Sequence, residues 1–281
     1  MKLKTRIAYA VFPPSVWDTL KQEWPMTKLR WKNTLLRRRI ERRFQNSREL
    51  KIHLGCGKRV MAGWVNVDCF RAPGIDLTGD LRCPLPFADH SARLIYSEHV
   101  LEHLQMEDAL QLLQQCKRVL APDGILRIGV PDAEIYLRAY TSGDQPFFDM
   151  LKHLGGAVNP LRTPMEVMNH MFRMGAQHLF AWDWPTLKLA LTEAGFVTTR
   201  KCAPGAASST EICLDDPDRA FETLYVEATK IPSGIEWFHK TGTARSVRTA
   251  SPEPSPLANE PLNHVNTHTS EVQPVRQHKQ G

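Results

Sequence analysis

The segment Lys51–Asp68 constrains the fold more than any other part of the chain. An apolar strand that ends at Leu54 runs directly into Gly55 and Gly57, and a short helix and a second strand are predicted before Asp68. Glycines at such positions allow a sharp turn and a close approach of the backbone to a ligand. A carboxylate at the carboxyl end of the strand beside a glycine loop can accept hydrogen bonds from both hydroxyls of a ribose. The segment therefore predicts a ligand that contains adenosine.

The spacing within this segment narrows the choice of ligand. The third glycine of a pyrophosphate-binding loop is replaced by Val60, and Asp68 lies 11 positions after Gly57, whereas a dinucleotide site places its acidic residue about 20 positions on. A short loop without the third glycine fits a ligand with one ribose and no pyrophosphate, such as S-adenosylmethionine. An ordinary strand turn would also explain a pair of glycines, so the rest of the chain has to support this reading.

Strands and helices alternate after the glycine loop. Strands are predicted over residues 65–67, 94–96, 125–130 and 224–228. One helix has an apolar face at helical spacing, and Ala121–Gly124 is predicted to break it. The residues of this apolar face are Ala109, Leu112, Leu113, Cys116, Val119 and Leu120. Such alternation indicates a parallel sheet that helices cover on both faces.

Several motifs in this order resemble one family. HLGCG, VNVD, GDL, LPFADHSARLIYSEHVLEHL and RVLAPDGILRIGVPD, spread over most of residues 49–230, are similar to the class I S-adenosylmethionine-dependent methyltransferases. The resemblance is strongest to the methyltransferase type 11 branch, and to its small bacterial members associated with surface-polysaccharide biosynthesis. It implies an α/β, Rossmann-like, doubly wound and mostly parallel seven-stranded sheet with one reversed strand near its edge. His53 stands where many members carry an acidic residue.

The resemblance also implies a cofactor site for S-adenosylmethionine. Gly55 and Gly57 would lie under the methionine and ribose, and Asp68 would bind the ribose hydroxyls. Other residues of the implied site are Asp80 and Leu81 beside the adenine, and Ser97 near the sulfonium. Asp80 has a second reading as the cap of the turn that follows it, because Asp readily hydrogen-bonds local backbone.

Two side chains are candidates for catalysis. Methyl transfer is an in-line displacement in which the protein mainly positions the reactants, and an oxygen nucleophile also benefits from a base. His99, just past the fourth strand, is the predicted base, since a neutral imidazole can accept a hydroxyl proton. His99 can instead orient the helix start or contact the cofactor. Asp132, at the end of the fifth strand, is a second candidate on the acceptor side.

A metal site is also considered on the same segment. His99 and His103 are four residues apart and have Glu98 and Glu102 beside them. The zincin arrangement needs a glutamate directly after its first histidine, and Val100 occupies that position. No metal is therefore predicted, and Glu102 and His103 are expected to brace the helix.

The segment 133–183 is longer than a crossover requires and is predicted to be a helical lid. Its polar residues His170, Arg173 and His178 are candidates for binding the acceptor, because loops at the carboxyl ends of parallel strands carry ligand sites. Its aromatic and Met residues have a second reading as a small helical core. They are Tyr136, Tyr140, Phe147, Phe148, Met165, Met168, Met171, Phe172 and Met174.

Positive charge is concentrated in the N-terminal extension, residues 1–48. This extension carries 13 Lys and Arg against 3 Asp and Glu, whereas the whole chain has a net charge of only +6. Leu36, Ile40 and Phe44 form an apolar stripe on a basic amphipathic helix, which can lie on an anionic membrane or grip phosphates. The alternative is that the stripe docks on the domain.

The remaining features concern the C-terminal segment and the compartment. Residues 231–281 hold six of the 20 prolines with little apolar periodicity, and they are predicted to be a disordered tail. The six cysteines include no C-x-x-C pair, and no signal peptide or membrane span is recognised. These features favour a cytoplasmic protein, with peripheral contact at the inner face of the membrane through the basic helix.

Three functions remain open at this point. The favoured one is methyl transfer to a polar acceptor, such as a sugar hydroxyl of a glycan precursor. The second is an RNA or protein methyltransferase that uses the basic extension, although no RNA-binding module accompanies it and nucleic acid is not the favoured partner. The third is a binding or scaffold protein that keeps the fold without turnover. The acceptor and the oligomeric state do not follow from the sequence.

Overall fold

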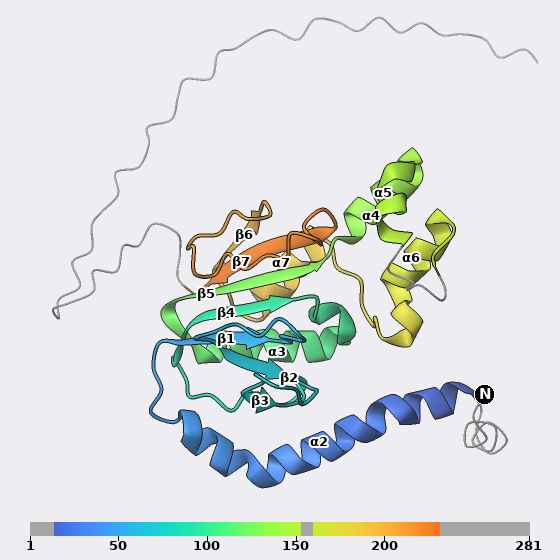
Figure 1. Cartoon of the computed structure of the whole chain (residues 1–281). Helices are drawn as coiled ribbons and strands as arrows, with labels where there is room; N and C mark the ends of the chain where they lie inside the picture. The colour runs from blue at the N-terminus through green and yellow to red at the C-terminus, as the bar shows by residue number, and fades with distance from the viewer. Residues whose placement is uncertain (1–13, 153–159, 231–281) are drawn as a thin grey trace, which may run out of the picture. The chain divides into compact units, whose positions relative to one another are not determined.

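Seven strands form one sheet in the order β3-β2-β1-β4-β5-β7-β6 (Figure 1). The computed structural model describes residues 14–152 and 160–230. The strands are β1 Leu50–Leu54, β2 Val65–Asp68, β3 Leu77–Thr78, β4 Ala92–Glu98, β5 Leu120–Pro131, β6 Thr198–Cys202 and β7 Thr223–Thr229. Strands β1 to β5 pair in parallel, and β7 is antiparallel to both β5 and β6. The predicted mostly parallel sheet with one reversed strand near its edge is confirmed.

Helices lie between the strands and before them. They are α2 Pro14–Phe44, η1 Leu101–His103, α3 Met106–Val119, α4 Ala133–Ser142, α5 Gln145–Leu151, α6 Pro164–Arg173, η3 Met174–Ala176 and α7 Trp184–Glu193. The predicted apolar face of α3 is buried. The segment Ala121–Gly124, predicted as a helix-breaking turn, belongs to β5 instead. A shift of register between Ala92 and Leu94 of the neighbouring strand accommodates this early start.

One face of the sheet is apolar and carries the main core. Alternate residues of the strands, such as Ile52, Ile95 and Ile128, are buried against Leu113 of α3 and Leu191 of α7. This follows from the two-residue period of a strand, which sends every second side chain to the same face. The helical cover predicted from the alternating pattern is therefore present on this face.

The opposite face is covered by loops. Trp64 and Ile212 pack there on Leu94 and Tyr96 of β4. The short helix predicted after the glycine turn is absent: residues 55–64 form turns. The Asn66 side chain explains this, since its Oδ1 accepts from Met61 N and its Nδ2 donates to Met61 O. Such local bonds hold the backbone outside the helical conformation.

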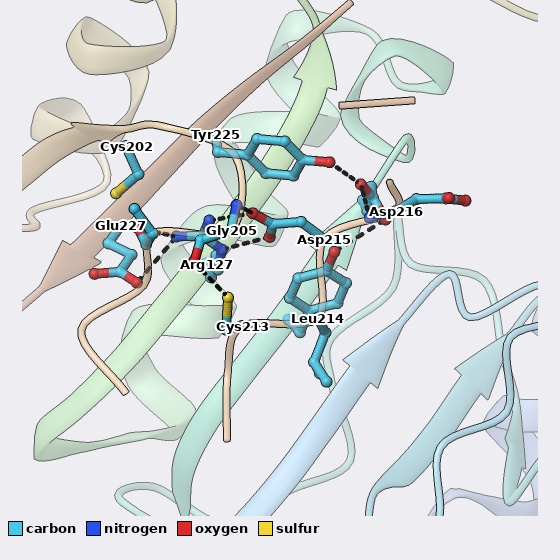
Figure 2. A network of polar contacts seen from close by, with 12 residues as sticks. Arg127, Cys202, Gly205, Cys213, Leu214, Asp215, Asp216, Tyr225 and Glu227 are labelled. Carbon is cyan, nitrogen blue, oxygen red and sulfur yellow. Dashed lines mark hydrogen bonds and ion pairs between the residues drawn. The ribbon is translucent and has the colours of Figure 1, made fainter. Parts of the chain in front are cut away.

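A buried ion network fastens the covering loop to this second face (Figure 2). Arg127 of β5 is fully buried, and its guanidinium donates to Asp215 of the loop and to Glu227 of β7. The Tyr225 ring lies 5.2 Å from the guanidinium carbon. Burial disfavours ionisation of Glu227, but hydrogen bonds from Ser208 and the nearby arginines more than offset it and lower its pKa. The three charged side chains are thus mutually dependent.

Helices α4, α5 and α6 build a separate small core. Tyr136, Phe147, Phe148, Met168 and Met171 are buried in it. Tyr140 and Met165 remain exposed. The segment 133–183 is therefore a helical insertion, and most of its aromatic and Met side chains serve as scaffold. Residues 153–159 of this insertion lie outside the described part of the chain.

The basic helix α2 docks on the domain. Ile40 and Phe44 pack against the main core, and the Phe44 ring meets Phe87 edge-on at 5.0 Å. The docking alternative for this stripe is therefore the observed arrangement, although the side chain of Leu36 lies outside the described ones. Among residues 14–152 and 160–230, every helix is too short or too polar to cross a bilayer. The predicted disordered tail, 231–281, also falls outside the description.

The Arg127 network gives the first prediction. Arg127→Ala removes the buried cation that Asp215 and Glu227 share, and it is expected to lower the free energy of unfolding by about 3–5 kcal/mol. Arg200→Ala is the matched control, because Arg200 also pairs with Glu227 but its side chain is 53% exposed; its cost is expected to be about 1 kcal/mol or less. Urea unfolding followed by circular dichroism measures both. Equal losses would contradict the role given to Arg127.

Candidate functional site

The glycine loop follows β1 at the carboxyl edge of the sheet. Gly55 and Gly57 both have left-handed backbones, with φ of 66° and 53°. A Cβ on Gly55 would lie 2.2 Å from Val100 Cγ2, so this position requires glycine. A Cβ on Gly57 would meet no atom within 4 Å. The loop is thus packed tightly on one side and borders open space at Gly57, which is where a ligand is predicted.

Asp68 fixes this loop from the end of β2. Its Oδ2 accepts from Gly57 N at 2.8 Å, and its Oδ1 accepts from Phe70 N at 2.9 Å. A carboxylate has about four lone-pair sites, so each oxygen keeps capacity for one further donor. The structure therefore brings Gly57 and Asp68 together, with acceptor capacity that two ribose hydroxyls can use. The role of Asp68 toward a ribose stays a prediction.

Ser97 lies near the end of β4, beside Leu54 of β1. Its side chain is buried, and its Oγ has no hydrogen-bond partner among the described residues. An unpaired buried hydroxyl costs about 1–3 kcal/mol. A bound polar ligand would remove that cost. This orphaned oxygen fits the predicted place of Ser97 beside the cofactor.

Asp80 has a partner that the sequence pattern did not predict, Arg30 of the helix α2. It is buried, and Arg30 of α2 donates from Nε to Oδ2 at 2.6 Å. Arg82 donates from its backbone N and from Nε to Oδ1, both at 3.0 Å. Burial opposes ionisation, but the Arg82 and Arg30 hydrogen bonds prevail and lower the pKa of Asp80. The turn-capping alternative describes the observed bond to Arg82 N.

A small cavity lies beside this carboxylate. Arg30, Asp80 and Leu81 are among its lining residues, and its volume is about 110 Å³. Sites for small molecules usually measure about 300–1,000 Å³. With α2 in place, the cavity is therefore smaller than most sites for small molecules. The predicted roles of Asp80 and Leu81 toward adenine stay predictions.

His99 follows β4 with a left-handed backbone, φ 53°, which is unusual for a residue other than glycine. Its Nδ1 lies 3.2 Å from Glu102 Oε1 and its Nε2 lies 3.0 Å from Thr223 Oγ1. Glu102 is buried, which opposes ionisation, but the hydrogen bond and charge of His99 outweigh burial and lower its pKa. The carboxylate thus orients the imidazole. Thr223 was not recognised from sequence, because it comes from β7.

Asp132 has a structural task in this fold. It is buried after β5 and caps α4, since its side chain accepts from Glu134 N at 3.1 Å. Lys201 Nζ lies 3.6 Å from Oδ2. Burial raises the pKa of this carboxyl. The capping of α4 is enough to explain the position of Asp132, and a role for Asp132 toward a methyl acceptor stays a prediction.

The three acceptor candidates of the insertion are placed differently. His178 meets His103 of η1 edge-on, with 4.8 Å between ring centroids. His170 is half-buried and Arg173 is exposed on α6. Burial lowers the pKa of His170 and of His178. The structure therefore brings His178 to the end of β4, while the described contacts of His170 and Arg173 do not reach the glycine loop.

A comparison with protein families gives one match. Residues 70–128, which include β3, β4 and α3, match the family described as methyltransferase domain. The match begins just after Asp68, so it does not include the glycine loop, and only the geometry of that loop supports its predicted role. It supports a methyltransferase enzyme with S-adenosylmethionine as cofactor. A comparison with curated proteins gives no match.

Solved structures show distant likeness to the chain. A protein from Thermotoga maritima, named as a methyltransferase and possible histamine N-methyltransferase, is 15% identical over 76% of this chain and 96% of its own, with a TM-score of 0.39. A proposed O-methyltransferase from Nostoc punctiforme is 12% identical over 54% of this chain, with a TM-score of 0.33. This chain spans only 35% of that second protein. Likenesses at these scores carry no weight for the acceptor.

The open space at Gly57 gives the second prediction. Gly57→Ala places a methyl group where the ligand is expected, and it should weaken S-adenosylhomocysteine binding more than about tenfold, or 1.4 kcal/mol. Gly143→Ala is the matched control, because Gly143 also has a left-handed backbone, φ 70°, with nothing within 4 Å. Both substitutions cost about 1–2 kcal/mol of backbone strain. Calorimetric titration measures binding, and equal affinities in the two variants would argue against the site.

Proposed function

We propose that this S-adenosylmethionine-dependent methyltransferase methylates a hydroxyl oxygen of a polar acceptor, with a sugar of a glycan precursor as the substrate class. The observation that carries the proposal is the buried Glu102 carboxylate, which holds His99 Nδ1 at 3.2 Å at the end of β4. An oriented imidazole is the arrangement expected of a base that serves an alcohol.

The cofactor site is the carboxyl edge around β1, β2 and β4. When bound, S-adenosylmethionine supplies a methyl group on a sulfonium that is already activated for transfer. Gly57 leaves room for the ligand, Asp68 offers two acceptor oxygens, and Ser97 has a hydroxyl without a partner. These three residues supply the shape and the polar contacts that a ribose and a methionine chain need.

His99 supplies the proton acceptor. With Nδ1–H donated to Glu102, Nε2 faces Thr223 Oγ1 at 3.0 Å, and the Thr223 hydroxyl itself donates to Arg219 O at 2.7 Å. That distance is the reach of a hydrogen bond between a base and the hydroxyl that it deprotonates. An acceptor hydroxyl would take the place of Thr223 as the partner of Nε2. His99 would accept the proton of this hydroxyl, while the cofactor would supply the methyl group and keep the sulfur as a neutral thioether.

Paired carboxylates line this edge. Acidic side chains collect where β4 and β5 end and where β7 begins, and each has a basic partner. Glu98 pairs with Arg59, Glu102 with His99, Asp132 with Lys201 and Glu222 with Arg219. Carboxylate oxygens accept hydrogen bonds from neutral hydroxyl groups, such as those of a sugar. The edge can therefore hold a sugar through its hydroxyl groups.

The third prediction tests the base. His99→Asn keeps a side chain that tolerates a left-handed backbone but cannot take up a proton. We expect turnover with labelled methyl donor to fall by about 10² to 10⁴, while S-adenosylhomocysteine binding stays within about twofold. His90→Asn replaces an exposed histidine that also has a left-handed backbone, φ 57°, and this control should turn over normally.

The acceptor panel contains glycosides, nucleotide sugars, RNA and peptides. Turnover of RNA or peptide in place of sugars would overturn the acceptor class. Cofactor binding with no turnover on any acceptor would favour the non-catalytic reading. A His99→Asn variant that turns over as fast as the wild type would remove His99 as the base.

The exposed face of α2 supports a place of action at an anionic membrane surface. Trp24, Trp31 and Leu35 are exposed at helical spacing, so that they share one face. Lys28, Arg38 and Arg42 lie on the same face, and Lys28 Nζ stands 5.2 Å from the Trp24 ring. Exposed Trp combined with basic residues is typical of helices that lie in a lipid interface. This stripe differs from the docked one that the sequence suggested.

The fourth prediction follows from this face. The protein should sediment with vesicles that contain phosphatidylserine and remain in solution with phosphatidylcholine alone, because the basic residues need anionic headgroups. The double variant Trp24→Ser, Trp31→Ser should bind about tenfold more weakly. Leu189→Ser, at an exposed apolar position of α7, is the control and should bind normally. Binding to RNA that vesicles cannot displace would contradict the lipid assignment.

A further inference from the structure

Glu102, which orients His99, also forms a cluster with His103 and His178. One potential ligand atom from each residue lies within 4.8 Å of the others. Glu102 and His103 belong to η1, whereas His178 follows η3 in the helical insertion. The fold therefore brings together two imidazoles and a carboxylate from distant parts of the chain.

Both imidazoles are held in the same tautomer. His103 Nδ1 lies 3.1 Å from Gln177 O, and His178 Nδ1 is hydrogen-bonded to Met171 O. A carbonyl oxygen can only accept, so each Nδ1 carries the proton and each Nε2 keeps its lone pair. Metal-bound histidines are oriented in this way, with the second ring nitrogen donating to a backbone carbonyl or a carboxylate.

The carboxylate adds an independent observation. Glu102 is 2% exposed, and its Oε1 is paired with His99. Its Oε2 is buried and has no hydrogen-bond partner among the described residues. Leaving an ionised oxygen unpaired in the interior is costly. A cation beside Oε2 would satisfy it.

We propose that Glu102 Oε2, His103 Nε2 and His178 Nε2 bind one divalent transition metal ion, with Zn²⁺ as the ion of choice. Two imidazoles and one carboxylate suit zinc, whereas Mg²⁺ and Ca²⁺ prefer oxygen ligands. Zinc–nitrogen bonds of about 2.0–2.1 Å place ligand atoms roughly 3.3 Å apart in a tetrahedron. The potential ligand atoms of the cluster lie within 4.8 Å of one another, so metal binding would draw the three side chains closer together.

The ion would join the helical insertion to the sheet domain beside His99. Glu102 would then use one oxygen for the metal and the other for His99 Nδ1. The spacing of the sequence suggested His99 and His103 as a pair of metal ligands. In the structure His99 faces Thr223, and the histidine beside His103 is His178. Three protein ligands leave a fourth position for water.

The test is metal binding by the full chain. Protein stripped with a chelator is titrated with Zn²⁺ in a calorimeter, and with Co²⁺ while the visible absorption of tetrahedral cobalt is recorded. We expect one equivalent of either ion, and a higher melting temperature with Zn²⁺, because a ligand that binds only the folded state stabilises it. His178→Gln, and separately Glu102→Gln, should weaken binding by about tenfold or more.

Two controls separate this site from other histidines. His170→Ala, in the same insertion, and the pair His264→Ala, His268→Ala, in the C-terminal segment, should bind Zn²⁺ as the wild type does. Absence of stoichiometric Zn²⁺ binding would overturn the proposal, as would binding that survives in both His178→Gln and Glu102→Gln. Loss of binding in the C-terminal pair would assign the metal elsewhere. None of these readouts depends on methyl transfer.

Discussion

The carboxyl edge of the sheet depends on one interaction, the hydrogen bond between the buried Glu102 carboxylate and His99. An ionised group in the interior costs several kcal/mol unless it is paired. His99 meets that demand through Nδ1, and its own left-handed backbone is held by the bond from His99 N to Gly129 O at 2.9 Å. The backbone carbonyl of Glu102 accepts from Leu179 N and Phe180 N. One residue thus orients the imidazole and anchors the insertion.

The two faces of the sheet are stabilised by different interactions. The face with Ile52, Ile95 and Ile128 is stabilised by the hydrophobic effect against helices, which is non-directional and tolerates some variation. The other face carries Arg127 and Glu227, whose burial is tolerable only with matched partners from the covering loop. The glycine turn after β1 is held in place by hydrogen bonds from its backbone N–H groups to Val67 O and to the Asp68 carboxylate. This leaves the space at Gly57 open.

Patterns within a few residues of one another were predictable. The apolar period of α3, the alternation in β4 and β5 and the glycine pair all depend on local spacing. The missing first helix was not predictable from such periods, since Asn66 holds Met61 through two side-chain bonds. Thr223 and His178 reach His99 and His103 only through the topology of the sheet and the insertion, and no sequence spacing records that. Arg30 reaches Asp80 for the same reason.

The contact between Arg30 and Asp80 joins the helix α2 to the sheet domain away from the docked end of the helix. The Arg30 side chain is 36% exposed, so its ion pair is weakened by water and salt. Arg82 holds the same carboxylate through its backbone and its guanidinium, within one turn of chain. Loss of this one ion pair therefore costs little, and Asp80 remains fixed by Arg82 when it breaks. Because Ile40 and Phe44 keep the end of α2 on the core, the pair can break without undocking the whole helix.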